Sequence, residues 1–264
     1  MTELVRKELR DQRRALIGWG IGLTGMVLMY SSFWPSVRDN ADQFASYLEN
    51  IPDALRSVIG ELSLGTPVGY LQSELFSFLG PALILVFAIG AGARSLAGEE
   101  EQGTLDLLVV TPITRRMIVL QKFSAMALTA LGLGAVLWIS VVVVGRLFGL
   151  DVAISDIVAA TLHLLLLGMA FGAIALFLGA WRGRRALAIG VTSALAVGTF
   201  ILNAFAPTVE GFAWAARLSP FFYYGDSLPL RNGLHVVHAG VLAAVASSAL
   251  IGAVVAFDRR DLRT

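Results

Sequence analysis

Six stretches of 20 to 29 mostly apolar residues divide the sequence, and they constrain the fold more than any other feature. They fall at about residues 15–34, 75–97, 117–145, 157–181, 186–207 and 238–257. An α-helix of this length can cross the hydrocarbon core of a bilayer. Helices are expected because unpaired backbone groups are too costly in lipid, and the segments lack the alternation of barrel strands. We therefore predict an all-α polytopic membrane protein with six transmembrane helices.

Composition agrees with a membrane protein and excludes several other classes. Apolar residues make up 56% of the 264 residues and charged residues only 15%, whereas soluble domains carry about 25% charged residues. The net charge of +1 gives no basis for binding nucleic acid through bulk charge. The absence of cysteine excludes disulfides and thiolate metal sites. No linker is long enough to separate soluble domains, so residues 1–264 are predicted to form a single transmembrane domain.

Lys and Arg residues are distributed unevenly between the segments that join the predicted helices. With the N-terminus in the cytoplasm, fifteen of the 20 basic residues fall on the cytoplasmic side and five on the other. The positive-inside rule then predicts that both termini are cytoplasmic. The first residues, MTELVRKELRDQRR, include acids and are followed by no cleavage site, so we expect the first apolar segment to stay in the membrane.

The segments outside the membrane helices carry weaker patterns. Residues 1–14 place Leu4 and Leu9 near helical spacing among basic residues. This predicts an amphipathic interfacial helix at the inner leaflet, with a basic tail that only sets topology as the alternative. Residues 35–74 carry two apolar stripes that predict two short amphipathic helices. The aromatic segment 210–238 is expected to anchor in the outer interface, with a partly re-entrant element as the alternative.

The loop between the second and third predicted helices, residues 98–116, has the most specific pattern, GEEEQGTLDLLVVTPITRR. Gly103 permits a sharp turn after three glutamates, and Thr104 is a good cap for a short apolar helix. Thr111 and Pro112 then supply a second cap, from which the third membrane helix would start. An apolar helix that projects into the cytoplasm needs a partner surface, either on another protein or on the chain's own membrane helices.

The segment from this loop to Lys122 resembles the signature of ABC type-2 permeases, the membrane subunits of ATP-driven exporters. In that family an acidic run, Gly-Thr-Leu, two further leucines, a proline and an arginine precede the third membrane helix, and a lysine follows. The matching residues here are Glu99, Glu100, Glu101, Gly103, Thr104, Leu105, Leu107, Leu108, Pro112, Arg115 and Lys122. Asp106 departs mildly from the pattern, because Glu is common there. Weaker similarities at residues 218–221 and 257–262 extend the resemblance over the six-helix layout.

The resemblance implies a transport subunit that is not itself an enzyme. Such a permease binds no ATP; two copies of a separate ATP-binding cassette subunit bind ATP and Mg²⁺, and the loop at 98–116 is the coupling helix that docks on them. The absence of a GxxxxGK[ST] motif agrees with this division. A second permease copy is also implied, as a homodimer or a related heterodimer, in the inner membrane of a prokaryote. The residues expected to couple to the ATPase are Glu99, Glu100, Glu101, Gly103, Thr104, Leu105, Leu107, Leu108, Pro112, Arg115 and Arg116.

The apolar character of the membrane helices bears on the cargo. It favours a lipophilic or amphipathic substrate, such as a drug, antibiotic, lipid or hydrophobic peptide, moved out of the cytoplasm or inner leaflet by alternating access. The alternative is an ion-coupled secondary transporter, which would need buried carboxylates or broken helices near the midplane. For His163 we expect a neutral side chain that is hydrogen-bonded to a neighbouring helix, rather than a proton relay. His235 and His238 lack a third metal ligand, so packing is expected of them.

Two predicted helices carry glycines at about four-residue spacing, which permits close contact between helices. These glycines are Gly18, Gly22 and Gly25 in the first helix and Gly168, Gly172 and Gly179 in the fourth. The contacts lie either within the chain or between two copies, and packing within the chain is the expectation.

Overall fold

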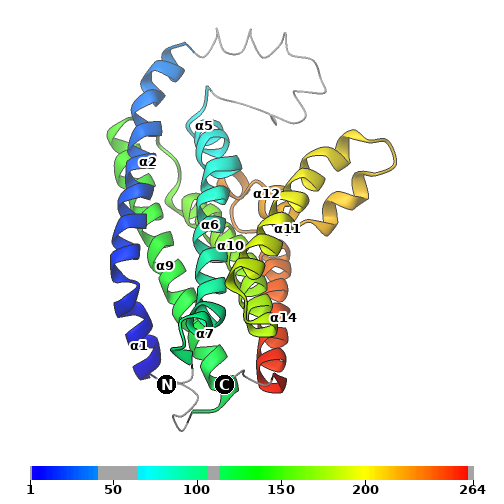
Figure 1. The fold of residues 1–264 in the computed structure, drawn as a ribbon. Helices are drawn as coiled ribbons and strands as arrows, with labels where there is room; N and C mark the ends of the chain where they lie inside the picture. The colour runs from blue at the N-terminus through cyan, green and yellow to red at the C-terminus, as the bar shows by residue number, and fades with distance from the viewer. Residues whose placement is uncertain (1, 41–64, 106–112, 261–264) are drawn as a thin grey trace.

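The computed structural model describes residues 2–40, 65–105 and 113–260. In these residues the regular elements are all helical, and six helices are long and apolar enough to cross a membrane. The chain is therefore a multi-pass helical membrane protein, as the apolar segments predict. Figure 1 shows a bundle with α1 (Thr2–Asp11) and the end of α14 at the same end. We call this the inner end, because the positive-inside rule predicts that it faces the cytoplasm.

Most of the observed membrane helices extend beyond the predicted segments. They are α2 (Arg13–Asp39), the continuous run from α5 to α7 (Pro67–Glu101), α9 (Arg115–Leu147), α10 (Ile154–Arg182), α11 (Arg185–Phe205) and α14 (Val236–Arg259). Hydropathy detects only the apolar part of a helix, whereas its hydrogen bonding continues until a cap or turn ends it. The second membrane helix begins at Pro67 rather than at residue 75, because the Thr66 side chain caps it by accepting the Gly69 N–H at 3.1 Å.

The second membrane helix contains two π-helical segments along its length. It consists of α5 (Pro67–Leu71), η1 (Gln72–Leu79), α6 (Gly80–Ala93), η2 (Arg94–Gly98) and α7 (Glu99–Glu101). The segments η1 and η2 are π-helical, a wider winding that often occurs at functional sites. Since η2 directly precedes three glutamates, its winding sets the directions in which their side chains point.

The centre of the bundle is α10, which packs against α6, α9, α11 and α14. Its glycines allow the approach of α6 and η2. A Cβ added to Gly172 would lie 3.1 Å from the Ala88 carbonyl oxygen, and one added to Gly179 would lie 3.4 Å from the Ala97 Cβ. Packing within the chain, as expected for these glycines, is confirmed for the fourth membrane helix.

The glycines of the first membrane helix behave differently. A Cβ added to Gly18, Gly22 or Gly25 would meet no atom within 4 Å. The expectation of packing within the chain is therefore wrong for α2. This helix packs along α9 with another of its faces, and the space beside its glycines is open.

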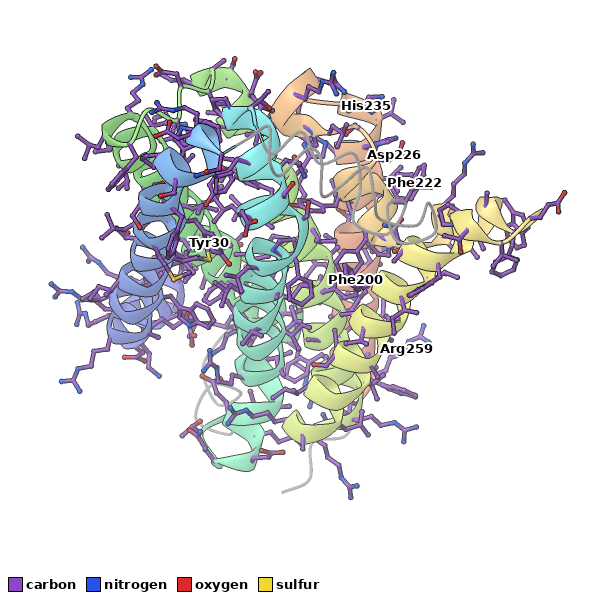
Figure 2. All side chains as sticks on the ribbon, turned by 90° about the horizontal axis from the view of Figure 1, so that it is seen from above. Tyr30, Phe200, Phe222, Asp226, His235 and Arg259 are labelled. Atoms are coloured by element: carbon purple, nitrogen blue, oxygen red, sulfur yellow. The ribbon has the colours of Figure 1, made fainter. Side chains whose placement is uncertain are left out.

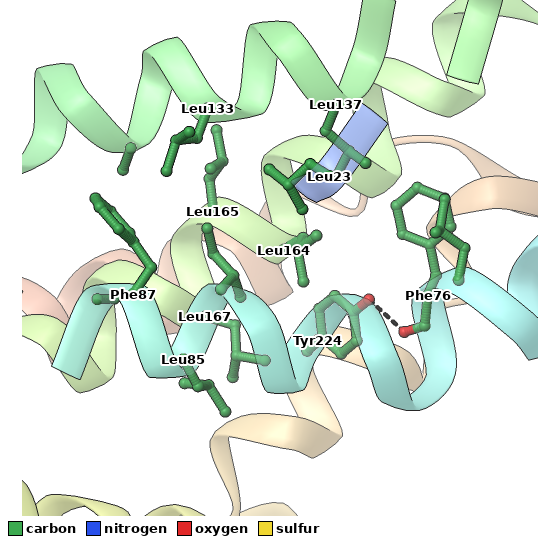
Figure 3. Packing of buried hydrophobic residues seen from close by; sticks show 14 of the residues in the cluster. Leu23, Phe76, Leu85, Phe87, Leu133, Leu137, Leu164, Leu165, Leu167 and Tyr224 are labelled. Atoms are coloured by element: carbon green, nitrogen blue, oxygen red, sulfur yellow. Dashed lines mark hydrogen bonds between the residues drawn. The ribbon is translucent and has the colours of Figure 1, made fainter. Parts of the chain in front are cut away.

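The aromatic segment between α11 and α14 folds into short helices at the outer end. These are η3 (Ala206–Thr208), η4 (Ala213–Leu218), α12 (Pro220–Gly225) and α13 (Pro229–Asn232). Phe221 and Tyr224 are buried, and the Tyr224 hydroxyl donates to the Phe76 carbonyl oxygen at 2.5 Å (Figure 3). Burial raises the pKa of Tyr224, so the hydroxyl keeps the proton that it donates. The prediction that these aromatics anchor in the outer interface is therefore wrong for Phe221 and Tyr224. Phe212 and Trp214 are exposed, so for them it stays a prediction.

Histidines also gather near the outer end. His163 is buried in α10, and its Nδ1 contacts the carbonyl oxygen one turn earlier at 3.0 Å. His235 caps α14 by accepting the His238 N–H at 3.3 Å, and the two rings lie 4.1 Å apart. In the described residues no group of three potential metal ligands occurs. Figure 2 shows Phe222, Asp226 and His235 on one side of this end. The packing expected of His235 and His238 agrees with their ring contact, whereas the Nδ1 contact of His163 lies within α10 rather than with a neighbouring helix, as was expected.

Two further expectations concern segments outside the membrane helices. The amphipathic helices expected in the loop 35–74 fall largely on residues 41–64, which lie outside the described residues. The helix expected over residues 1–14 is present as α1, and it packs against α9. Its placement at the inner leaflet stays a prediction.

Candidate functional site

The loop that follows α7 begins as the sequence predicts. Gly103 has a φ of +68°, and the Thr104 N–H donates to the Glu99 carbonyl oxygen at 2.9 Å, which closes the helix. Leu105 is buried in a cluster with Ile118 and Phe257, so its side chain contacts the chain's own helices. Outside the described residues lie Leu107, Leu108, Thr111 and Pro112.

The first of the three glutamates, Glu99, belongs to a buried cluster of charges. The ammonium of Lys122, on α9, donates to carboxylate oxygens of Glu99 and of Glu8 on α1. The Lys122 side chain is only 1% exposed, and the two glutamate side chains are 20% and 13% exposed. A buried ammonium needs such partners, because desolvation without them is costly. Lys122 therefore joins α1, α7 and α9.

The second glutamate, Glu100, pairs with the residue that follows α14. The Arg260 guanidinium donates to the Glu100 carboxylate and, at 3.2 Å, to the Ala180 carbonyl oxygen near the end of α10. Arg115 in turn donates to the Arg260 carbonyl oxygen at 2.6 Å. Gly183, in the turn after α10, has a φ of +61° and packs against this pair. The contacts join α7 to the ends of α10 and α14 and to the start of α9.

The third glutamate, Glu101, caps the start of another membrane helix. Its carboxylate accepts the backbone N–H of Arg185 at 2.9 Å. Arg185 is the first residue of α11, whose N-cap Arg184 makes no side-chain capping hydrogen bond. A carboxylate at this position satisfies an otherwise unpaired N–H and interacts favourably with the helix dipole.

Replacing Glu101 with alanine tests this cap. Loss of a capping oxygen typically costs about 1 kcal/mol, so amide exchange at Arg185 should rise about fivefold in E101A. The variant E101Q keeps a carbonyl oxygen and should keep most of the protection. Hydrogen exchange of the first turn of α11, followed by mass spectrometry in detergent, measures both variants. Equal exchange in E101A and the unchanged chain would show that Glu101 does not cap α11.

The two arginines predicted at the start of the third membrane helix also contact the end of α14. Arg116 pairs with Asp258 at 2.8 Å on the surface, while Arg115 donates to the Arg260 carbonyl oxygen.

The start of α9 differs from the prediction. The Thr114 side chain caps it by accepting the Met117 N–H at 3.4 Å, and the residue before Thr114 is not helical. The helix thus begins at Arg115, two residues before the predicted residue 117, and the cap predicted at Thr111 and Pro112 lies outside the described residues.

The predicted site residues of the described part thus lie together at the inner end. Glu99, Glu100, Glu101, Arg115 and Arg116 all contact other parts of the same chain. Glu99 and Glu100 are not solvated charges, because their side chains are only 20% and 21% exposed and both are paired with cations. Six further residues lie in this site although the sequence did not predict them there: Glu8, Lys122, Gly183, Arg185, Asp258 and Arg260. The family signature could have identified three of them, because Lys122 matches it and Asp258 and Arg260 lie in residues 257–262, which also resemble it.

These features define a multi-pass helical membrane protein in which an acidic run, Glu99–Glu101, and its partners Lys122, Arg185 and Arg260 connect the inner loop to five surrounding helices. The sequence model of the ABC-2 family of transporter proteins matches residues 2–221. The chain belongs to this family and is a transport component of the permease type. A comparison with individual curated proteins finds no match.

Proposed function

We propose that this chain is the permease subunit of an ATP-driven exporter, and that residues 98–116 contact a separate ATP-binding cassette ATPase. Family membership supports a membrane component that works with an ATPase. Two ATPase copies, which bind ATP and Mg²⁺, would act on two permease copies, either identical or related. The cargo would be lipophilic or amphipathic, since the membrane helices are almost wholly apolar.

The observation that carries this proposal is the set of contacts made by the acidic run. Through it the loop after α7 is attached to α1, α9, α10, α11 and α14. A displacement of the loop by an ATPase would therefore reach most of the membrane helices at once, because packed elements move as bodies. Without such attachments a flexible loop would absorb the displacement.

The leucines of the loop have different roles in this proposal. Leu105 anchors the loop, because it is buried against Ile118 and Phe257. Leu107 and Leu108 provide the apolar contact with the ATPase. Polar substitution there should break the contact while leaving membrane insertion unchanged, because the sequence places both residues in the loop between two predicted membrane helices.

Purification of the tagged chain in mild detergent tests the function. We expect vanadate-sensitive ATPase activity to copurify, and to fall at least tenfold when Leu107 and Leu108 are both changed to Asp. Leu234→Asp is the matched control, because Leu234 is a half-exposed leucine at the outer end. It should retain the activity. If no ATPase copurifies and none is cross-linked in intact membranes, the proposal fails, and ion-coupled transport becomes the alternative, with His163 as the first residue to test.

A further inference from the structure

An open apolar groove lies between the first and second membrane helices. It has a volume of about 420 Å³ and is lined by Ala15, Gly18, Trp19, Gly22, Leu23 and Leu83. This volume lies within the range of small-molecule sites in proteins, about 300–1,000 Å³. Trp19 bridges the two helices, since its ring meets that of Phe87 edge-on at 5.9 Å. The glycines leave the groove open, because neither Gly18 nor Gly22 has a neighbour within reach of a Cβ.

A basic residue lies on the same stripe of the helix as the groove. Arg14, Gly18 and Gly22 are four residues apart, so they lie along one face of α2. Side chains on a helix tilt toward its N-terminus, which directs Arg14 toward the inner end. In the described part of the chain Arg14 is exposed and forms no ion pair. A guanidinium without a partner is thus available at the inner mouth of the groove.

The length of the groove matches one leaflet. From Arg14 to Gly22 the helix rises by about 12 Å, compared with about 15 Å for half of the hydrocarbon core. The groove therefore runs from the level of the headgroups toward the midplane. An occupant needs an acidic head and an apolar chain, because the lining is apolar and the charge at the mouth is positive.

We propose that this groove binds an anionic phospholipid of the inner leaflet, with its phosphate on Arg14 and an acyl chain along Gly18 and Gly22. Guanidinium binds phosphate through paired charge-assisted hydrogen bonds. A second copy of the chain is disfavoured as the occupant. Symmetric pairing of two α2 helices through this stripe would bring two unpaired Arg14 side chains together. The site does not depend on an ATPase partner.

Quenching of Trp19 fluorescence by brominated lipid tests the site directly. The chain is reconstituted in phosphatidylcholine vesicles that contain increasing amounts of brominated phosphatidylglycerol or brominated phosphatidylcholine. The Trp19 signal is obtained by subtracting the signal of a W19F variant prepared in the same way. One arginine near the membrane surface favours an anionic lipid about fivefold. Half-maximal quenching should therefore need about fivefold less phosphatidylglycerol than brominated phosphatidylcholine.

Three variants identify the groove as the origin of this preference. R14Q should remove it, whereas R13Q should keep it, because Arg13 lies on a different face, in line with the exposed Ile17. G22L fills the groove and should reduce quenching by both lipids. Equal quenching by the two lipids in the unchanged chain, or a preference that persists in R14Q, would overturn the proposal. So would a disulfide between two copies of a G22C variant, which would place a second chain in the groove.

Discussion

Replacing Lys122 with methionine is expected to lower the free energy of unfolding by about 3–5 kcal/mol, the typical effect of removing one partner from a buried ion pair. The variant leaves the carboxylates of Glu8 and Glu99 facing one another without a cation. Unfolding of the purified chain in mixed micelles with increasing SDS fraction measures the change.

Removal of all three charges separates electrostatics from packing. A triple variant, E8M with K122M and E99M, should recover most of the lost stability, because a buried ion cluster replaced by apolar side chains is often neutral. Arg6→Met is the control on the exposed side of α1, where substitutions usually change stability by less than about 0.5 kcal/mol. A K122M variant as stable as the R6M control would show that the cluster does not hold α1 on α9.

The second large effect is expected at Gly183. An alanine there would have to adopt a φ near +61°, which costs an L-residue about 1–2 kcal/mol. Its Cβ would also lie 2.5 Å from a Glu100 carboxylate oxygen and in contact with the Arg260 guanidinium. We therefore expect G183A to displace the Glu100–Arg260 pair and to lose at least 2 kcal/mol in the same unfolding measurement, about the backbone cost together with a lost charge-assisted hydrogen bond.

Gly190 supplies the matched control for this substitution. It lies within α11, and a Cβ added to it would meet no atom within 4 Å. G190A should therefore be neutral or stabilising by up to about 1 kcal/mol, as is usual for alanine in a helix. Equal effects of G183A and G190A would contradict the role assigned to the turn after α10.

The sequence predicts the membrane helices well because their length is set by the bilayer, and a run of apolar residues is a local signal. It predicts the turn at Gly103 for the same reason, since a glycine after a charged helix end is a local pattern. The third membrane helix begins at Arg115 rather than at residue 117, because Arg115 and Arg116 are charged and a hydropathy pattern does not include them in the helix.

The partners of the acidic run are a different case. Glu100 and Arg260 are 160 residues apart, and Lys122 and Glu8 are 114 residues apart. No periodicity connects such pairs, so the three glutamates look like a solvated run until the helices are packed. The α2 glycines were misjudged because four-residue spacing fixes only that they share a face. Which neighbour covers that face depends on the tertiary arrangement.

The central claim is that the acidic run makes the loop after α7 move together with the ends of the membrane helices. The chain has no cysteine, so spin labels placed by Q102C and R259C, both exposed positions, report the distance within one chain when the labelled chain is diluted with unlabelled chain. We predict the same distance in the nucleotide-free and vanadate-trapped complex, and a broader distribution when E100Q breaks the Arg260 pair. A shift of several ångströms between the two states in the otherwise unchanged chain would contradict the account.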